Sequence, residues 1–143
     1  LTLTAARENL WRCWTEASLL TQWFAPAPFT TPHAELDLRV GGKSLVIMRT
    51  PDGEEMENPG VYLEIEHARR LVFTDAYTEA WIPAEKPFMT TLLTFGDALA
   101  GGTRYIARAR HWSIEDRNTH EKMGFIEGWT QCAHQLDALA NTL

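Results

Sequence analysis

Two side chains suited to proton transfer are the first candidates for chemistry in this sequence. His111 closes a predicted strand, and Glu121 lies one helical turn before Phe125 near the start of a predicted terminal helix. If that end of the helix approaches the end of the strand, His111 and Glu121 form an acid–base pair. A glutamate in a first helical turn is also expected from the helix dipole alone. Both residues are therefore weak catalytic candidates.

The sequence shows no other pattern typical of a catalytic or metal-binding site. Asp75 and Glu79 share one strand face, but about 13 Å separates them at 3.3 Å per residue, which is too far for a carboxylate dyad. No nucleophile or nucleotide-binding motif is present. We expect no metal and no cofactor, since the histidines lack ligand spacing; they are His33, His67, His111, His120 and His134.

Composition excludes several classes of partner. The net charge of −6 argues against nucleic acid, and no apolar run approaches the roughly 20 residues that span a membrane. Arg104, Arg108 and Arg110 alternate along one strand, which favours a solvated face over an anion site. Cys13 and Cys132 lie in apolar helical patterns and predict reduced thiols in a cytoplasmic protein. No signal peptide is visible, and an N-terminal piece is expected to be missing.

The elements that must position these residues follow a simple order. Thr4 is the expected N-cap of a helix over residues 5–16, and a short helix over 17–24 follows. Alternating patterns predict six consecutive strands, at residues 33–40, 43–50, 61–66, 70–81, 88–95 and 103–112. In the third strand, Val61, Leu63 and Ile65 are expected on one face and Tyr62, Glu64 and Glu66 on the other. A terminal helix is expected from about residue 115 to 143, and a further strand near or before Leu1.

Hairpin-length connections between consecutive strands indicate an antiparallel sheet. A terminal helix of about 40 Å must be covered by that sheet along its apolar stripe, so the sheet is expected to curve around it. The predicted fold is α+β, with a curved six- or seven-stranded antiparallel sheet around a long C-terminal helix and two short N-terminal helices. The 143 residues suit a single domain, residues 1–143.

Small residues face each other across this predicted interior. The strand face opposite the arginines carries Ala107 and Ala109, and Gly124 and Gly128 flank the apolar stripe of the terminal helix. Each glycine costs about 1 kcal/mol of helix propensity relative to alanine. The pattern allows close packing with nothing bound, or an apolar cavity for a small ligand. The predicted cavity residues are Trp23, Phe24, Phe73, Trp81, Tyr105, His111, Trp112, Gly124, Phe125 and Gly128.

Several segments together resemble the START-like (SRPBCC) superfamily, in its branch related to the activator of heat-shock-protein-90 ATPase. The most specific are "RLVFTDAY" and "EDRNTHEKMGFIEGW", and the likeness covers nearly the whole chain. The resemblance implies a helix-grip fold with a deep, mainly apolar cavity. The chain departs from it at Thr4-Ala5-Ala6, where relatives have Asp-Ala-Pro, and in a leading strand shortened to residues 1–3.

The family contains carriers, cyclases and cochaperones, so the fold does not select a function. Our leading hypothesis is a soluble protein that binds a small apolar or aromatic molecule. The alternatives are a cyclase- or hydrolase-like enzyme that uses the same cavity, and a cochaperone-like domain with a chaperone partner. The sequence leaves open whether the protein forms a homodimer.

Overall fold

The first two helices bury apolar side chains that the sequence places at helical spacing. The computed structural model describes residues 1–79, 82–84 and 87–143, with α1 at Arg7–Thr15 and α2 at Ala17–Leu20. Leu10, Trp11 and Trp14 of α1 are at most 3% exposed, because they share the helix face that turns to the core. Both helices confirm the predicted pattern.

The start of α1 differs from the prediction. Its N-cap is Ala6, and no side chain caps the helix. The Thr4 hydroxyl instead donates a hydrogen bond of 2.8 Å to Asp137 near the C-terminus. The expected cap is therefore wrong, because a carboxylate acceptor on another helix engages Thr4.

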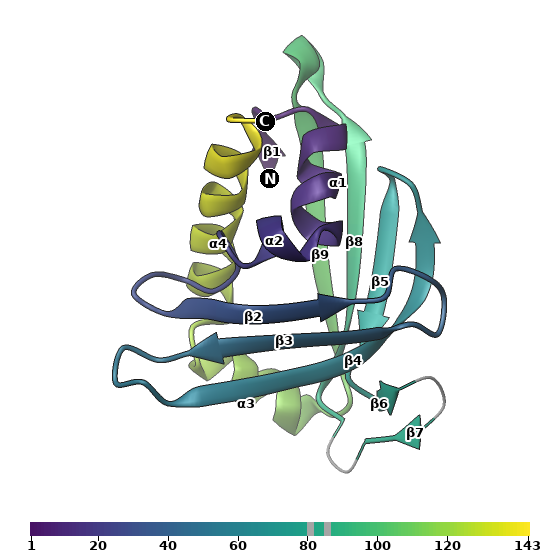
Figure 1. Cartoon of the computed structure of the whole chain (residues 1–143), viewed down its shortest axis with the longest axis vertical. Coiled ribbons are helices and arrows are strands. Elements are labelled where there is room, and N and C mark those ends of the chain that lie inside the picture. The colour runs from purple at the N-terminus through teal and green to yellow at the C-terminus, as the bar shows by residue number, and fades with distance from the viewer. Residues whose placement is uncertain (80–81, 85–86) are drawn as a thin grey trace.

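Within the described residues, seven strands form one antiparallel sheet in the order β1-β9-β8-β5-β4-β3-β2. Their bounds are Thr2–Leu3 (β1), Thr30–Leu36 (β2), Lys43–Arg49 (β3), Glu55–Glu66 (β4), Arg70–Thr74 (β5), Met89–Asp97 (β8) and Thr103–His111 (β9). A 3-10 turn at Leu99–Gly101 joins β8 to β9, and a separate pair, β6 (Tyr77–Glu79) and β7 (Ile82–Pro83), follows β5. Figure 1 shows β2, β3 and β4 running across the molecule while β8 and β9 run along it, as a strongly bent sheet requires.

The two faces of β9 are those expected from its sequence. Arg104, Arg108 and Arg110 are exposed, whereas Tyr105 is 4% exposed and Ala107 is half-buried against the core. Strict alternation survives here because β9 pairs with β8 in unbroken register from end to end.

The faces of β4 differ from the prediction. A register shift between Tyr62 and Glu64 leaves Leu63 without a partner on β5, and Leu63 is 38% exposed. Tyr62 therefore points into the core and is 3% exposed, although the alternating pattern placed it on the polar face. The bulge is the physical reason, since one extra residue inverts the alternation beyond it.

The predicted strand over residues 70–81 is divided. β5 ends at Thr74, and β6 begins at Tyr77. Between them the Asp75 carboxylate accepts hydrogen bonds from the backbone N–H groups of Phe88 (2.8 Å) and Met89 (3.1 Å). These bonds hold the start of β8 and turn the chain away from the sheet after β5.

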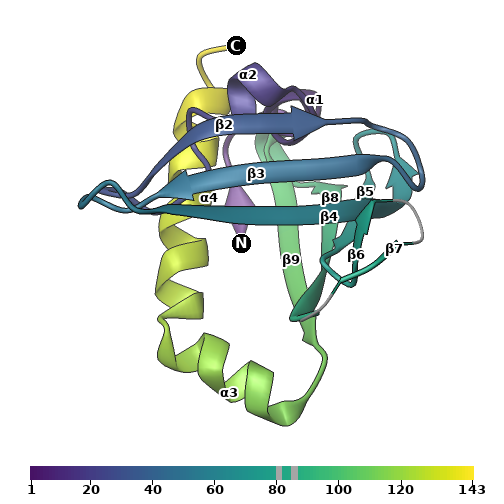
Figure 2. The ribbon, with the colours of Figure 1, turned by 60° about the horizontal axis from the view of Figure 1, so that its bottom comes forward.

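The long terminal helix of the prediction is two helices. α3 spans Ile114–Lys122 and α4 spans Phe125–Ala140, and Gly124 between them is left-handed with φ +82°. Figure 2 shows α3 turned away from α4 at the end of the molecule opposite the C-terminus. At 1.5 Å per residue α4 is about 24 Å long, which is shorter than the predicted rod. Gly124 is thus a helix break rather than a notch in a helix face.

The C-terminal half of α4 is its most deeply buried part, and Trp129 and Cys132 in the first half also pack against the core. Ala133, Leu136 and Ala140 are at most 2% exposed. Gln135 donates hydrogen bonds to the carbonyl groups of Trp23 (2.7 Å) and Ala25 (2.8 Å) in the loop after α2. α4 is therefore held both by the core and by the loop after α2.

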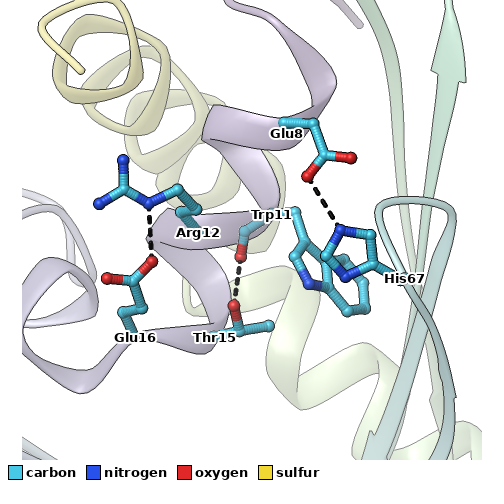
Figure 3. Close-up of polar contacts among 6 residues, drawn as sticks. All are labelled: Glu8, Trp11, Arg12, Thr15, Glu16 and His67. Atoms are coloured by element: carbon cyan, nitrogen blue, oxygen red, sulfur yellow. Dashed lines mark hydrogen bonds and ion pairs between the residues drawn. The ribbon is translucent and has the colours of Figure 1, made fainter.

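A surface contact joins α1 to the turn between β4 and β5. Glu8 and His67 lie 2.9 Å apart, and the His67 ring lies beside the Trp11 ring at a centroid distance of 5.5 Å (Figure 3). Arg12 donates to Glu16 at 2.7 Å one turn further along the helix. Both ion pairs are exposed, so they position α1 more than they stabilise it.

Among the described residues, no helix combines the length and the hydropathy that crossing a membrane requires.

Alanine substitutions at the two glycines of the terminal segment are expected to have opposite effects on stability. Gly124→Ala is expected to lower the free energy of unfolding by about 1–2 kcal/mol, because a side chain disfavours positive φ. Gly128→Ala is expected to raise it by up to about 1 kcal/mol, because Gly128 lies inside α4. Urea unfolding of both variants measures the difference.

The surroundings of Gly128 leave room for an alanine side chain, so Gly128→Ala should not introduce a steric clash. A Cβ atom there would lie 4.0 Å from Cγ of Pro26, which is an ordinary van der Waals contact. Equal losses in both variants would contradict the assignment of the break to Gly124.

Candidate ligand-binding site

A small cavity lies between the N-terminal helices and the bent sheet. Its volume is about 30 Å³, room for one or two water molecules. Its lining is almost wholly apolar and consists of Trp14, Leu20, Phe24, Leu36, Ser44, Val46, Tyr62, Leu71 and Phe73. Residues from two helices and four strands therefore line the same cavity, as they do in a ligand pocket. The cavity is nevertheless too small for a ligand larger than water.

The polar side chains of this lining are Tyr62 and Ser44. Burial raises the pKa of Tyr62 to about 12, and a hydrogen bond with the Ser44 side chain opposes that rise. The phenol of Tyr62 is therefore neutral at physiological pH and can donate or accept a hydrogen bond. It is the group in this cavity best placed to orient a polar ligand atom.

Aromatic rings fill the space around the cavity. The Trp14 ring lies 4.8 Å from Trp23, 5.9 Å from Phe24 and 5.8 Å from Phe73, measured between centroids. It also stacks on Trp129 of α4 at 6.4 Å with an interplanar angle of 22°. These contacts explain the small volume, since aromatic rings occupy most of the interior, which the sequence allowed to be either closely packed or hollow.

The buried tryptophans are also fixed by hydrogen bonds. Trp14 Nε1 donates to the Tyr105 hydroxyl at 3.2 Å, and Trp23 Nε1 donates to the carbonyl of Cys13 at 2.9 Å. Burial raises the pKa of Tyr105 above its ordinary value, while the bond from Trp14 acts against it. The aromatic cluster is therefore a satisfied, ordered core.

The structure brings two of the predicted cavity residues together at this cavity, Phe24 and Phe73. Trp23 and Tyr105 belong to the surrounding core, and Trp112 is 62% exposed. Trp112 follows the last residue of β9, so its ring has left the sheet face that would direct it inward.

The remaining predicted cavity residues lie along the terminal segment or outside the described structure. Gly124 forms the helix break, and Gly128 faces Pro26. Trp81 and the side chain of Phe125 lie outside the described residues.

His111, the candidate base, has a different described partner from the one the sequence suggested. Its Nε2 lies 2.7 Å from Nδ1 of His120, and both rings pack edge-on against Phe88. Burial, and secondarily the neighbouring His111, lowers the pKa of His120. Glu121 is exposed and lines an open hollow of about 330 Å³ together with Asn118 and Lys122. The described geometry therefore brings His111 to His120 and leaves Glu121 exposed.

Thiol chemistry finds no support in the structure. Both cysteines are free, and burial raises the pKa of Cys13 to about 11 and the pKa of Cys132 above its ordinary value. Neither thiol therefore ionises readily at neutral pH. Across residues 1–79, 82–84 and 87–143, no group of three metal-ligating side chains comes together.

Reasoning from the sequence missed Tyr62, Ser44, Trp14 and His120. A bulge reversed the orientation of Tyr62, and the pattern gave no sign of it. Trp14 lies in the predicted first helix, but its position at the cavity depends on how α1 lies on the sheet. His120 was considered only as a metal ligand, and its contact with His111 depends on the helix break at Gly124.

Comparison with known proteins places this chain in a family. The model of the family described as "Activator of Hsp90 ATPase homolog 1-like protein" matches residues 4–141. Protein NE0264 from Nitrosomonas europaea is 34% identical, with a TM-score of 0.94 over 99% of this chain and 91% of that chain. Protein Ms6760 from Mycobacterium smegmatis is 26% identical, with a TM-score of 0.80 over 97% of this chain and 86% of that chain.

A search of the curated proteins gave no match. The observed topology confirms the helix-grip expectation, and the family supports a ligand-binding or cochaperone-like domain. The chain therefore belongs to the family of Activator of Hsp90 ATPase homolog 1-like proteins, within the START-like superfamily.

Proposed function

We propose that the protein binds a small aromatic or apolar molecule that carries one polar group, in the cavity beside Tyr62. The observation that carries this proposal is the composition of the lining, in which the Tyr62–Ser44 pair stands among apolar and aromatic side chains. Such a lining favours the apolar body of a ligand and orients it through a single hydrogen bond.

The small volume of the cavity sets a condition on binding. A cavity of about 30 Å³ cannot hold an aromatic ring unless a lining side chain moves. Phe24 and Leu36 are the best suited to move, because both are half-buried and Leu36 lies on β2, the edge strand of the sheet. Binding is therefore expected to be weak and to require displacement of one of these side chains.

Phenol and toluene provide a matched pair of probes for this site. Phenol is expected to bind more tightly than toluene, because only phenol can hydrogen-bond to Tyr62. Tyr62→Phe is expected to lower phenol affinity about fivefold, the equivalent of one net hydrogen bond, and to leave toluene affinity unchanged. Chemical-shift perturbation in two-dimensional amide spectra measures both affinities.

Two further variants serve as a control for the hydroxyl effect and as a test of cavity size. Tyr105→Phe removes a buried hydroxyl outside the cavity and should leave the ratio of phenol to toluene affinity unchanged. Phe24→Ala enlarges the cavity and should strengthen binding of both probes. Perturbations that cluster away from the cavity lining, or Phe24→Ala binding neither probe, would contradict the proposal.

A cochaperone-like role is the second candidate, and the well-filled interior favours it. A domain with so little internal space can act through its outer surface, and the family includes proteins described as activator-like. Binding to a purified bacterial heat-shock-protein-90 homologue tests this role. The enzyme alternative receives no support from the geometry, because His111 contacts His120 and Glu121 lines an exposed hollow.

A further inference from the structure

Three arginines form a row on the outer face of β9. Arg104, Arg108 and Arg110 are exposed, whereas Tyr105, on the other face of the strand, is buried in the core. At about 3.3 Å per residue, Arg108 lies about 13 Å from Arg104 and about 7 Å from Arg110 along the strand. Ile106, half-buried, lies between Arg104 and Arg108 on the same face. β9 therefore presents positive charge on both sides of an apolar side chain.

The strand beside β9 adds no charge to this face. Residues paired across an antiparallel ladder lie on the same face of the sheet. The β8 partners of the outer residues of β9 are Thr90, Leu92, Thr94 and Gly96. On the next strand, β5, the Arg70 side chain is already engaged by Glu64 at 2.7 Å. The neighbourhood of the row is therefore neutral, with Leu92 as a second half-buried apolar side chain.

The carboxylates on this face of the described sheet are distant from the row. Glu64 and Glu66 are on β4, three strands from β9, which is about 14 Å at the usual spacing between strands. Interactions between exposed charges at such distances are largely screened at physiological ionic strength. The charge of the β9 arginines is therefore not balanced by the sheet itself.

Other arginines at the surface do have carboxylate partners. Arg12, Arg39, Arg49 and Arg70 each lie 2.7 Å from a carboxylate oxygen. Within the parts of the chain that the structure describes, no such ion pair involves an arginine of β9. Like charges grouped without a counter-charge create a local positive potential that attracts an anionic partner.

The apolar side chains within the row favour a protein partner over a polyanion. A phosphate backbone has no apolar group that could cover Ile106 and Leu92. The net charge of −6 also repels nucleic acid and anionic membranes, because both extend beyond the arginines over the rest of the surface. A short acidic segment of a protein covers the row alone and can supply both carboxylates and apolar side chains.

We propose that the outer face of β8 and β9 binds an acidic segment of another protein, with carboxylates against the arginines of β9 and an apolar side chain against Ile106 and Leu92. Alternate side chains of an extended segment recur about every 7 Å, which is the spacing of the outward residues of β9. The cavity is lined by the opposite face of the sheet, through Leu71 and Phe73. The surface therefore acts independently of any ligand in the cavity.

A synthetic peptide tests this surface on the whole protein. Every second residue is serine, and the residues between are glutamate, leucine, glutamate and glutamate; a companion peptide has serine in place of leucine. The first peptide is expected to shift the amide resonances of residues 89–97 and 103–111, and to bind at least about fivefold more weakly when salt rises from about 0.15 M to about 0.5 M. Absence of binding at about 1 mM peptide, or shifts confined to other elements, would overturn the proposal.

Three variants separate the surface from a general effect of charge. Arg108→Glu is expected to lower the affinity for the peptide about tenfold, because repulsion replaces attraction. Arg39→Glu makes the same change in net charge between β2 and β3, at the other edge of the sheet, and should change affinity by less than about twofold. Ile106→Thr should weaken binding of the leucine peptide about threefold and leave binding of its companion unchanged. Equal losses in Arg39→Glu and Arg108→Glu would contradict the proposed surface.

Two competing probes decide between classes of partner. Tighter binding of an oligothymidylate, or of vesicles of phosphatidylglycerol, to the same face would assign it to nucleic acid or to a membrane and overturn the proposal. Because no phenol or toluene is present, failure of the peptide experiment leaves the cavity proposal standing. Failure of phenol binding likewise leaves the surface on β8 and β9 standing.

Discussion

Replacing Trp14 with alanine is expected to lower the free energy of unfolding by about 4 kcal/mol. The Trp14 side chain is central to the aromatic cluster, where it contacts Trp23 and Phe73 and stacks on Trp129 of α4. Its removal also leaves the Tyr105 hydroxyl without the hydrogen bond from Nε1. The loss is a large part of the 5–15 kcal/mol that stabilises a typical domain, so the variant is expected to be partly unfolded on mild heating.

Urea unfolding followed by far-ultraviolet circular dichroism measures this loss. The matched control is Trp112→Ala, which removes the same side chain from a position 62% exposed and is expected to change stability by about 0.5 kcal/mol or less. Trp14→Phe keeps a ring in the cluster and should fall between the two. Equal destabilisation by Trp14→Ala and Trp112→Ala would show that the aromatic cluster does not hold the core together.

The order of elements and the class of fold could be predicted because local patterns carry them. In β9 the alternation of Arg104 with Tyr105 and of Arg108 with Ala107 records which side of the sheet is buried. Hairpin-length links between strands then restrict the topology to an antiparallel sheet. These features depend on residues close in sequence, so they are visible before any tertiary contact is known.

The break at Gly124 could not be predicted, because a glycine inside a helical pattern has two outcomes. It can remain helical at a cost of about 1 kcal/mol, as Gly128 does, or it can adopt positive φ and end the helix. Gly124 adopts positive φ in a structure where Leu136 is buried in the core and His120 contacts His111. Both contacts join residues on either side of Gly124 to other parts of the fold. Neither contact leaves a periodic signal in the sequence.

The candidate site was predicted less well than the fold. Phe24 and Phe73 were expected and line the cavity, whereas Tyr62 was expected to face outward. Small residues such as Ala107 suggested free space, but the side chains that fill it, Trp14 and Trp23, come from the N-terminal helices. The size of a cavity depends on how the N-terminal helices pack against the sheet. Composition gives only the number of large aromatic side chains, not where they lie.

The clamp between the chain termini supplies the second large expected effect. The Asp137 carboxylate accepts hydrogen bonds from Thr4 N (3.1 Å), Thr4 Oγ1 (2.8 Å) and Ala5 N (2.8 Å). It thereby satisfies donors in the segment just before α1 and ties that segment to α4. Asp137→Ala is expected to lower the free energy of unfolding by about 3 kcal/mol, since hydrogen bonds to charged groups contribute about 1.5–3 kcal/mol each and are not fully additive here.

Urea unfolding and a double-mutant cycle with Thr4→Ala test the clamp. Asp137→Asn keeps an oxygen acceptor and should recover part of the loss, while Asp52→Ala, in an exposed turn, should change stability by about 0.5 kcal/mol or less. The Asp137 and Thr4 substitutions should couple by about 1 kcal/mol, because Thr4→Ala removes the hydroxyl donor and keeps the backbone N–H. Strict additivity, or a loss in Asp137→Ala no greater than in Asp52→Ala, would show that the Asp137 contacts do not help to hold α4 in place.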